Sequence, residues 1–184
     1  MTDIAVVWFK RDLRCADHAP LAAAVRCRAV LGLYVLEDEW LEAPEWDPQH
    51  WEFIRQSLLE LRRALAARGM PLLLRRGAMP AVLAQLRRDY PFTELFSHQE
   101  TGAAWSYARD RRVAAWCREQ GVRWREWPQF GVFRPLARRD GWAAAWEQFM
   151  AKPLLAAVDR LPGTAAQLDQ GEIPTLRALD RPEA

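Results

Sequence analysis

Charged and amide side chains directly follow three apolar segments of this sequence. Side chains of these types can bind a ligand. The three groups are Lys10 and Arg11 after residues 4–9, Glu37 and Asp38 after residues 30–36, and Gln99 and Glu100 after residues 94–97. Cations bind anionic groups, and carboxylates accept hydrogen bonds from N–H groups. Short apolar segments rich in β-branched and aromatic residues are typical of buried strands. Because ligands of open α/β sheets bind at the carboxyl ends of strands, we expect these side chains to share one crevice.

The loop after the first segment also has a purely structural interpretation. Arg11, Asp12 and Arg14 could form ion pairs that shape this loop instead of contacting a ligand. Asp17 is the expected N-cap of the helix that follows. Glu100 has two interpretations as well, because an acidic residue just before a helix stabilises the helix N-terminus.

Strand-like and helix-like segments alternate along the chain. This alternation predicts an α/β fold, in which a doubly wound, five-stranded parallel sheet carries helices on both faces. The expected strands are residues 4–9, 30–36, 72–74, 94–97 and 122–127.

Two long helices and one shorter helix show clear start and stop signals. The first runs from Pro48 to Arg68, with Asp47 as its N-cap and apolar residues at steps of three and four. The second is expected over residues 102–120, with Thr101 as its cap and Gly121 as its end. A last helix is expected from about residue 140 to residue 151, and the pattern after it is typical of a linker.

The bulk composition excludes several classes of protein. The chain has 184 residues and a net charge of +2, which is too small to indicate nucleic-acid binding by itself. No apolar run reaches the ~20 residues that span a bilayer, and no leader precedes the first segment. Cys15, Cys27 and Cys117 are odd in number and widely separated. We therefore expect reduced thiols and a cytoplasmic protein that does not bind a membrane.

The remaining residues with catalytic or metal-binding potential form no recognisable site. His18, His50 and His98 lie in different segments without the spacing of metal ligands. The sequence also lacks the phosphate-binding and nucleophile motifs of common enzymes. We therefore expect no metal and no catalytic residues in this chain.

The opening residues 6–14, Val-Val-Trp-Phe-Lys-Arg-Asp-Leu-Arg, resemble the start of the photolyase/cryptochrome family. The resemblance continues through residues 76–83, Gln99-Glu100 and Arg109-Asp110. It implies a Rossmann-like domain over residues 1–151, with strand order 3-2-1-4-5. Residues 152–184 would form a linker toward a C-terminal helical domain that binds FAD and lies outside this chain.

The resemblance also implies a function. The chain would be the domain that holds a light-harvesting antenna chromophore in a full protein that repairs pyrimidine dimers or signals in blue or near-UV light. FAD and DNA would bind through the C-terminal domain, so this chain alone should lack deoxyribodipyrimidine photo-lyase activity. The expected site residues are Lys10, Arg11, Glu37, Asp38, Gln99, Glu100 and Trp105.

The type of chromophore follows from a departure from the family pattern. Several members carry an Asn-Glu pair for folate just before the Arg-Asp motif, whereas this chain has Trp105-Ser106-Tyr107 near that position. A flavin, lumazine or deazaflavin ring is therefore expected rather than folate. Two alternatives stay open: a nucleotide-binding or interaction domain of similar architecture without photochemistry, and a scaffold of this family that has lost its antenna.

Overall fold

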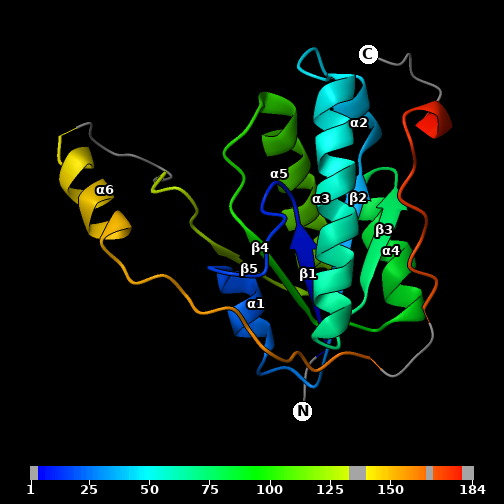
Figure 1. Cartoon of the computed structure of the whole chain (residues 1–184), viewed down its shortest axis with the longest axis horizontal. Coiled ribbons are helices and arrows are strands. Elements are labelled where there is room, and N and C mark those ends of the chain that lie inside the picture. The colour runs from blue at the N-terminus through cyan, green and yellow to red at the C-terminus, as the bar shows by residue number, and fades with distance from the viewer. Residues whose placement is uncertain (1–3, 133–139, 165–167, 180–184) are drawn as a thin grey trace.

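The computed structural model describes residues 4–132, 140–164 and 168–179. At its centre is a parallel sheet whose strands lie in the order β3-β2-β1-β4-β5 (Figure 1). This arrangement confirms the predicted fold class and strand order. The strands are β1 (Ile4–Phe9), β2 (Ala29–Leu36), β3 (Leu72–Arg76), β4 (Glu94–His98) and β5 (Arg123–Trp127).

Helices cover both faces of the sheet because alternate strand residues point to opposite faces. The helices are α1 (Ala19–Ala24), α2 (Asp38–Leu41), α3 (Pro48–Ala67), α4 (Met79–Asp89), α5 (Ala104–Gln120) and α6 (Trp142–Met150), with a 3₁₀ turn η1 at Arg177–Leu179. Val7 and Phe9 of β1 pack into the cluster formed with α1 and α3, whereas Val6 and Trp8 pack into the cluster formed with α4 and α5. None of the helices described is long and apolar enough to cross a membrane.

Two predicted helix caps are wrong. His18, not Asp17, caps α1, and its ring Nδ1 accepts a hydrogen bond from the Leu21 N–H at 3.2 Å. Asp17 has a φ of 47° and its carboxylate instead accepts a hydrogen bond from the Leu155 N–H at 3.1 Å. Helix α5 begins at Ala104 rather than at residue 102, and Ala103 is its N-cap. The Thr101 N–H donates to the Glu100 carboxylate at 2.9 Å, which holds this loop outside the helix.

The segment after α6, which we call the strap (residues 152–164 and 168–179), lies along the domain. In Figure 1 it runs in orange and red beneath the sheet and then beside α3 and β3. The Val30 N–H donates to the Pro162 carbonyl at 2.7 Å, and the Trp51 indole N–H donates to the Pro174 carbonyl at 3.1 Å. Leu161 is buried in the α1–α3 cluster. The strap is therefore packed against the core, and its role as a connection to a further domain stays a prediction.

Candidate functional site

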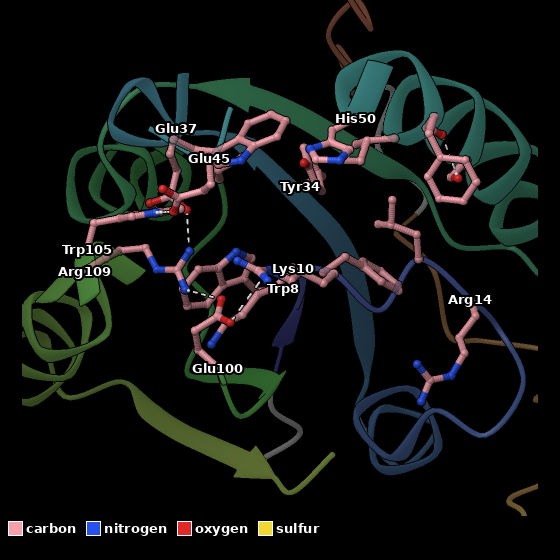
Figure 2. A pocket seen from close by; sticks show the side chains of 18 residues that line it. Trp8, Lys10, Arg14, Tyr34, Glu37, Glu45, His50, Glu100, Trp105 and Arg109 are labelled. Atoms are coloured by element: carbon pink, nitrogen blue, oxygen red, sulfur yellow. Dashed lines mark hydrogen bonds and ion pairs between the residues drawn. The ribbon is translucent and has the colours of Figure 1, made fainter. Parts of the chain in front are cut away.

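A cavity of about 650 Å³ opens at the carboxyl ends of β1 and β2, between α3 and the start of α5 (Figure 2). Its volume lies in the usual range for small-molecule sites. Five of the seven residues expected to bind a chromophore line it: Lys10, Arg11, Glu37, Glu100 and Trp105. The strand order explains this convergence, because β1 lies between β2 and β4 and their end loops meet at one edge.

The other two expected residues lie outside the cavity lining. Asp38 is the first residue of α2 and forms an exposed ion pair with Arg76, with 2.8 Å between Oδ1 and Nε. The Gln99 backbone N–H donates to the Trp127 carbonyl at 2.8 Å. Each follows its strand as expected, but only Glu37 and Glu100, one member of each pair, line the cavity.

A buried guanidinium, that of Arg109 on α5, organises the charged side of the cavity. Its nitrogen atoms lie 2.6 Å from Glu37 Oε1, 3.0 Å from Glu100 Oε2 and 2.9 Å from Asp110 Oδ1. Figure 2 shows Arg109, Glu37 and Glu100 converging near Trp105. Arg109-Asp110 is one of the motifs that resemble the photolyase/cryptochrome family, and the fold places Arg109 at the strand ends. Arg109 therefore ties β2, β4 and α5 together at the cavity.

Burial and charge act in opposite directions on the two cavity carboxyls. Burial raises the pKa of Glu37 from 4.5 to about 7, although the Arg109 guanidinium opposes this shift. Burial would also raise the pKa of Glu100, but Arg109, Lys10 and Arg11 outweigh it, so this pKa is lowered. Glu100 is therefore the permanent anion of the cavity, and Glu37 changes charge near neutral pH.

The titration of Glu37 predicts a pH-dependent stability. An acid whose pKa is raised in the folded state stabilises that state below its unfolded pKa and loses this contribution as pH rises through the folded pKa. Relative to Glu37→Gln, the wild-type free energy of unfolding should fall by about 1–3 kcal/mol between pH 4.5 and pH 8. Urea unfolding of both proteins across this range measures the difference. Parallel stability curves would contradict a raised pKa for Glu37.

Lys10 and Arg11 have different roles at the cavity. The Lys10 side chain is only 5% exposed, and its Nζ lies 3.1 Å from Asp110 Oδ2 and 3.5 Å from Glu126 Oε1. The Arg11 side chain is 59% exposed, and its Nε lies 3.9 Å from Glu100 Oε1. The Lys10 ammonium group is therefore held in ion pairs with Asp110 and Glu126. The more exposed Arg11 guanidinium is the cation that can contact a bound molecule.

The opposite side of the cavity is apolar and comes from the α2–α3 region. Trp40, His50, Phe53 and Ile54 line it, and the Phe53 side chain is 73% exposed. Sequence reasoning missed these residues because it searched strand ends and treated α3 only as a packing helix. Phe53 offered a signal, since it is an aromatic residue beside, and not within, the apolar stripe of α3. A flat ring would therefore meet aromatic side chains here and hydrogen-bonding groups on the other side.

A second polar cluster, formed by Asp12, His18 and His98, lies beneath the loop after β1 and is completely buried. Asp12 Oδ2 lies 2.6 Å from His98 Nδ1 and 2.9 Å from His18 Nε2, and Asp12 Oδ1 accepts a hydrogen bond from the Lys10 N–H at 2.8 Å. Burial would raise the pKa of Asp12, but both histidines outweigh burial and lower it. The expected ion pairing of Asp12 with the loop arginines is replaced by these histidine contacts.

These three residues have types that can bind a metal ion, yet their hydrogen bonds do not fit one. His18 Nδ1 accepts the Leu21 N–H, so the neutral ring carries its proton on Nε2, the atom that faces Asp12. A metal-bound histidine uses an unprotonated nitrogen and donates from the other one. These residues, which we call the Asp12 cluster, therefore join the loop after β1, the start of α1 and the end of β4 through buried polar contacts. Sequence spacing could not reveal it, because His18 and His98 are 80 positions apart.

Comparisons with known proteins agree with this architecture. The family model described as DNA photolyase matches residues 5–140. A cryptochrome DASH from Solanum lycopersicum is 30% identical over 105 residues, which cover 53% of this chain and 18% of that protein. A deoxyribodipyrimidine photo-lyase from Salmonella typhimurium is 43% identical over 70 residues, which cover 37% of this chain and 15% of that protein. The chain thus spans only a small part of the curated relatives that it matches.

Solved structures show the same fold. A bacterial class III photolyase from Agrobacterium tumefaciens superposes with a TM-score of 0.76 at 19% identity, over 94% of this chain and 38% of that one. An archaeal photolyase from Sulfolobus tokodaii, solved with two FAD molecules, superposes with a TM-score of 0.76 at 17% identity, over 98% of this chain and 42% of that one. Since the family model covers well over half of the sequence, the chain belongs to the DNA photolyase family.

Proposed function

We propose that this chain is an antenna domain that holds a flavin-type ring in the cavity at the carboxyl ends of β1 and β2. The observation that carries the proposal is the two-sided lining of this cavity. Trp40, Phe53 and Trp105 offer aromatic surface, while Glu100 and Arg11 offer a hydrogen-bond acceptor and a cation. An isoalloxazine ring has an apolar benzenoid end and a polar end with an N–H group, which matches both sides.

Two further observations support a flavin over a folate. Trp105 lines the cavity, and its indole N–H donates to Glu45 Oε1 at 2.8 Å. In the sequence it lies near the position at which the family resemblance implies an Asn-Glu pair for folate, a pair that this chain lacks. The archaeal neighbour was solved with two FAD molecules and is described as implying a novel light-harvesting cofactor. A deazaflavin ring has the same three-ring shape, and a lumazine ring is a smaller flat ring; both share the flavin's N–H group between two carbonyls, so they belong to the same class of ligand.

The role of the whole protein is part of this proposal. The full protein would contain a C-terminal FAD domain that binds DNA and repairs pyrimidine dimers or signals, and the cavity ring would pass excitation energy to that FAD. This chain alone would then show no photo-lyase activity. Cys15, Cys27 and Cys117 form no disulfide, which suits a reducing compartment such as the cytoplasm. A nucleotide-binding domain without photochemistry is the less favoured function, because the loop after β1 contains no glycine.

Titration with riboflavin, followed by flavin fluorescence, tests the proposal. Glu100→Ala should weaken binding about tenfold or more, because a hydrogen bond to a charged group contributes roughly 1.5–3 kcal/mol. Glu119→Ala, on the exposed C-terminal turn of α5, is the matched control and should bind like wild type.

A variant that fills the cavity shows whether riboflavin binds there or on another surface of the protein. Ser57 lines the cavity from α3, whereas its neighbour Gln56 is exposed and does not line it. Ser57→Trp should abolish riboflavin binding, and Gln56→Trp should leave it intact. Equal affinities in these two variants would place the ligand elsewhere, and tighter binding of folate than of riboflavin would overturn the flavin class.

A further inference from the structure

Two acids of the cavity share one guanidinium. Arg109 Nη1 lies 2.6 Å from Glu37 Oε1, and Arg109 Nη2 lies 3.0 Å from Glu100 Oε2. Both acids line the cavity, and Figure 2 shows them on either side of the Arg109 guanidinium. An ionised carboxylate can only accept hydrogen bonds, whereas a neutral carboxyl group can also donate one. The protonation state of each acid therefore decides which edge of a ring it can bind.

Glu100 is held as the anion. Its Oε1 accepts the Thr101 N–H at 2.9 Å, and its Oε2 accepts from Arg109. Although burial would raise its pKa, the charges of Arg109, Lys10 and Arg11 lower it. Each carboxylate oxygen has two lone pairs, so Glu100 can accept a further bond from a ring N–H group. The exposed Arg11 side chain lies beside it and can donate to a neighbouring ring carbonyl.

Glu37 has an oxygen that is available to a ligand. Among the described residues, Glu37 Oε2 has no hydrogen-bond partner, and it is not one of the unpartnered polar atoms that are sealed from solvent. The titratable and charged groups that face Glu37 are Tyr34 on β2, Glu39 on α2, Glu100 after β4, and Arg109 and Asp110 on α5. Tyr34 stays neutral because burial raises its pKa. Burial and the neighbouring acids raise the pKa of Glu37 to about 7, against the effect of Arg109.

The polar edge of a flavin-type ring requires both kinds of acid. It carries an N–H group between two carbonyls, so its complement is an acceptor between two donors. Glu100 supplies the acceptor and Arg11 one donor, and Glu37 supplies the second donor when its carboxyl group carries a proton. The pterin ring of a folate has an amino group in place of one of these carbonyls. It therefore presents two adjacent donors, which an ionised Glu37 and Glu100 can accept together.

We propose that the proton on Glu37 selects the ring that the cavity binds: neutral Glu37 donates to a carbonyl of a flavin-type ring, and ionised Glu37 accepts from the amino group of a pterin. This inference rests on the proposed function, because it needs a ring edge at Glu100 and Arg11. When Glu37 is ionised in the free protein, a flavin-type ring binds with uptake of one proton from solvent. When Glu37 is neutral, a pterin binds with release of that proton. The cavity thus favours flavins in mildly acidic solution and pterins in mildly alkaline solution.

Lumazine and pterin are matched probes, because they differ only by a carbonyl or an amino group at one ring position. They also ionise alike, so the ratio of their affinities isolates the effect of Glu37. Fluorescence titration of the wild-type chain measures this ratio, which should change by about a hundredfold in favour of pterin between pH 6 and pH 8. Riboflavin does not ionise in this range and should bind about tenfold more weakly at pH 8 than at pH 6.

Glu37→Gln keeps a hydrogen-bond donor and has no proton to lose. Its affinity for riboflavin should be the same at pH 6 and at pH 8, and its ratio for lumazine and pterin should not change with pH. Calorimetry in buffers of different ionisation enthalpy should show uptake of close to one proton per riboflavin by wild type at about pH 8, and none by Glu37→Gln. Glu119→Gln, on the exposed end of α5, is the matched control and should behave like wild type.

A second control concerns His50, which also lines the cavity and belongs to a residue type that titrates near neutral pH. His50→Gln should keep the change in the ratio with pH, whatever its effect on affinity. A wild-type ratio that is constant with pH would overturn the inference, as would an unaltered pH dependence in Glu37→Gln. Either result would leave the proposed function standing, whereas riboflavin that binds at no pH would remove both. The wild-type ratio decides the matter even if a variant does not fold.

Discussion

Arg109→Met should lower the free energy of unfolding of this chain by about 3–5 kcal/mol, the usual cost of leaving buried charges without their partner. Arg109 is the shared partner of Glu37, Glu100 and Asp110, and the side chains of Arg109 and Glu37 are less than a tenth exposed. Methionine keeps much of the aliphatic stem and removes the guanidinium. Urea unfolding followed by circular dichroism measures the loss.

A surface pair on the same helix provides the matched control. Arg112 of α5 bonds both carboxylate oxygens of Glu39, and both side chains are nearly half exposed. Exposed ion pairs contribute 0–1 kcal/mol because water screens the charges. Arg112→Met should therefore cost less than about 1 kcal/mol. If the two arginine variants lose the same stability, Arg109 does not organise the cavity.

Asp12→Ala should have the second large effect, a loss of roughly 3–5 kcal/mol. The change removes the acceptor of the Lys10 N–H and the partner of both buried histidines, and each buried donor without a partner costs about 1–3 kcal/mol. Chemical unfolding at pH 7 measures the loss. Asp47→Ala is the control, because its exposed carboxylate caps α3 through the Gln49 N–H and should cost about 1 kcal/mol.

The Asp12 cluster also predicts how the free energy of unfolding changes with pH. The pKa of Asp12 is lowered in the folded state. An acid with a lowered folded pKa contributes stability above its unfolded pKa and loses it as pH falls through the folded pKa. The difference between wild type and Asp12→Ala should therefore be complete at pH 7 and shrink only below about pH 4. A difference that vanishes already at pH 6 would show that Asp12 is not held as the anion.

Much of the fold could be predicted because local signals and burial agree. Residues 4–9, which were expected to form the first strand, are β1 without any shift in bounds, and Pro48 begins α3 behind the Asp47 cap. Five strands alternating with helices permit few topologies, and the family resemblance selected the observed order. The convergence of Lys10, Glu37 and Glu100 at one edge follows from this order alone.

The parts that could not be predicted depend on contacts between distant segments. His18 caps α1 because its ring is held by Asp12, and nothing near His18 in the sequence signals the partnership with His98. The apolar cavity wall is formed by the exposed side of α3, which the periodicity of its buried face does not describe. The strap is held against the core by backbone hydrogen bonds, such as the one that the Leu74 N–H donates to the Gln170 carbonyl at 2.7 Å. Such bonds cannot be predicted from residue types, because every residue except proline carries the same backbone N–H and carbonyl groups.

The central claim is that a flavin-type ring occupies this cavity, and the tryptophans of the chain can report it directly. Their indole N–H groups give separate signals in ¹H–¹⁵N correlation spectra, which single Trp→Phe variants assign. Riboflavin should shift the signals of Trp40 and Trp105 in the cavity wall and leave those of Trp142 and Trp146 on exposed α6 in place. Shifts confined to Trp142 and Trp146, or none at all at saturating riboflavin, would contradict the account.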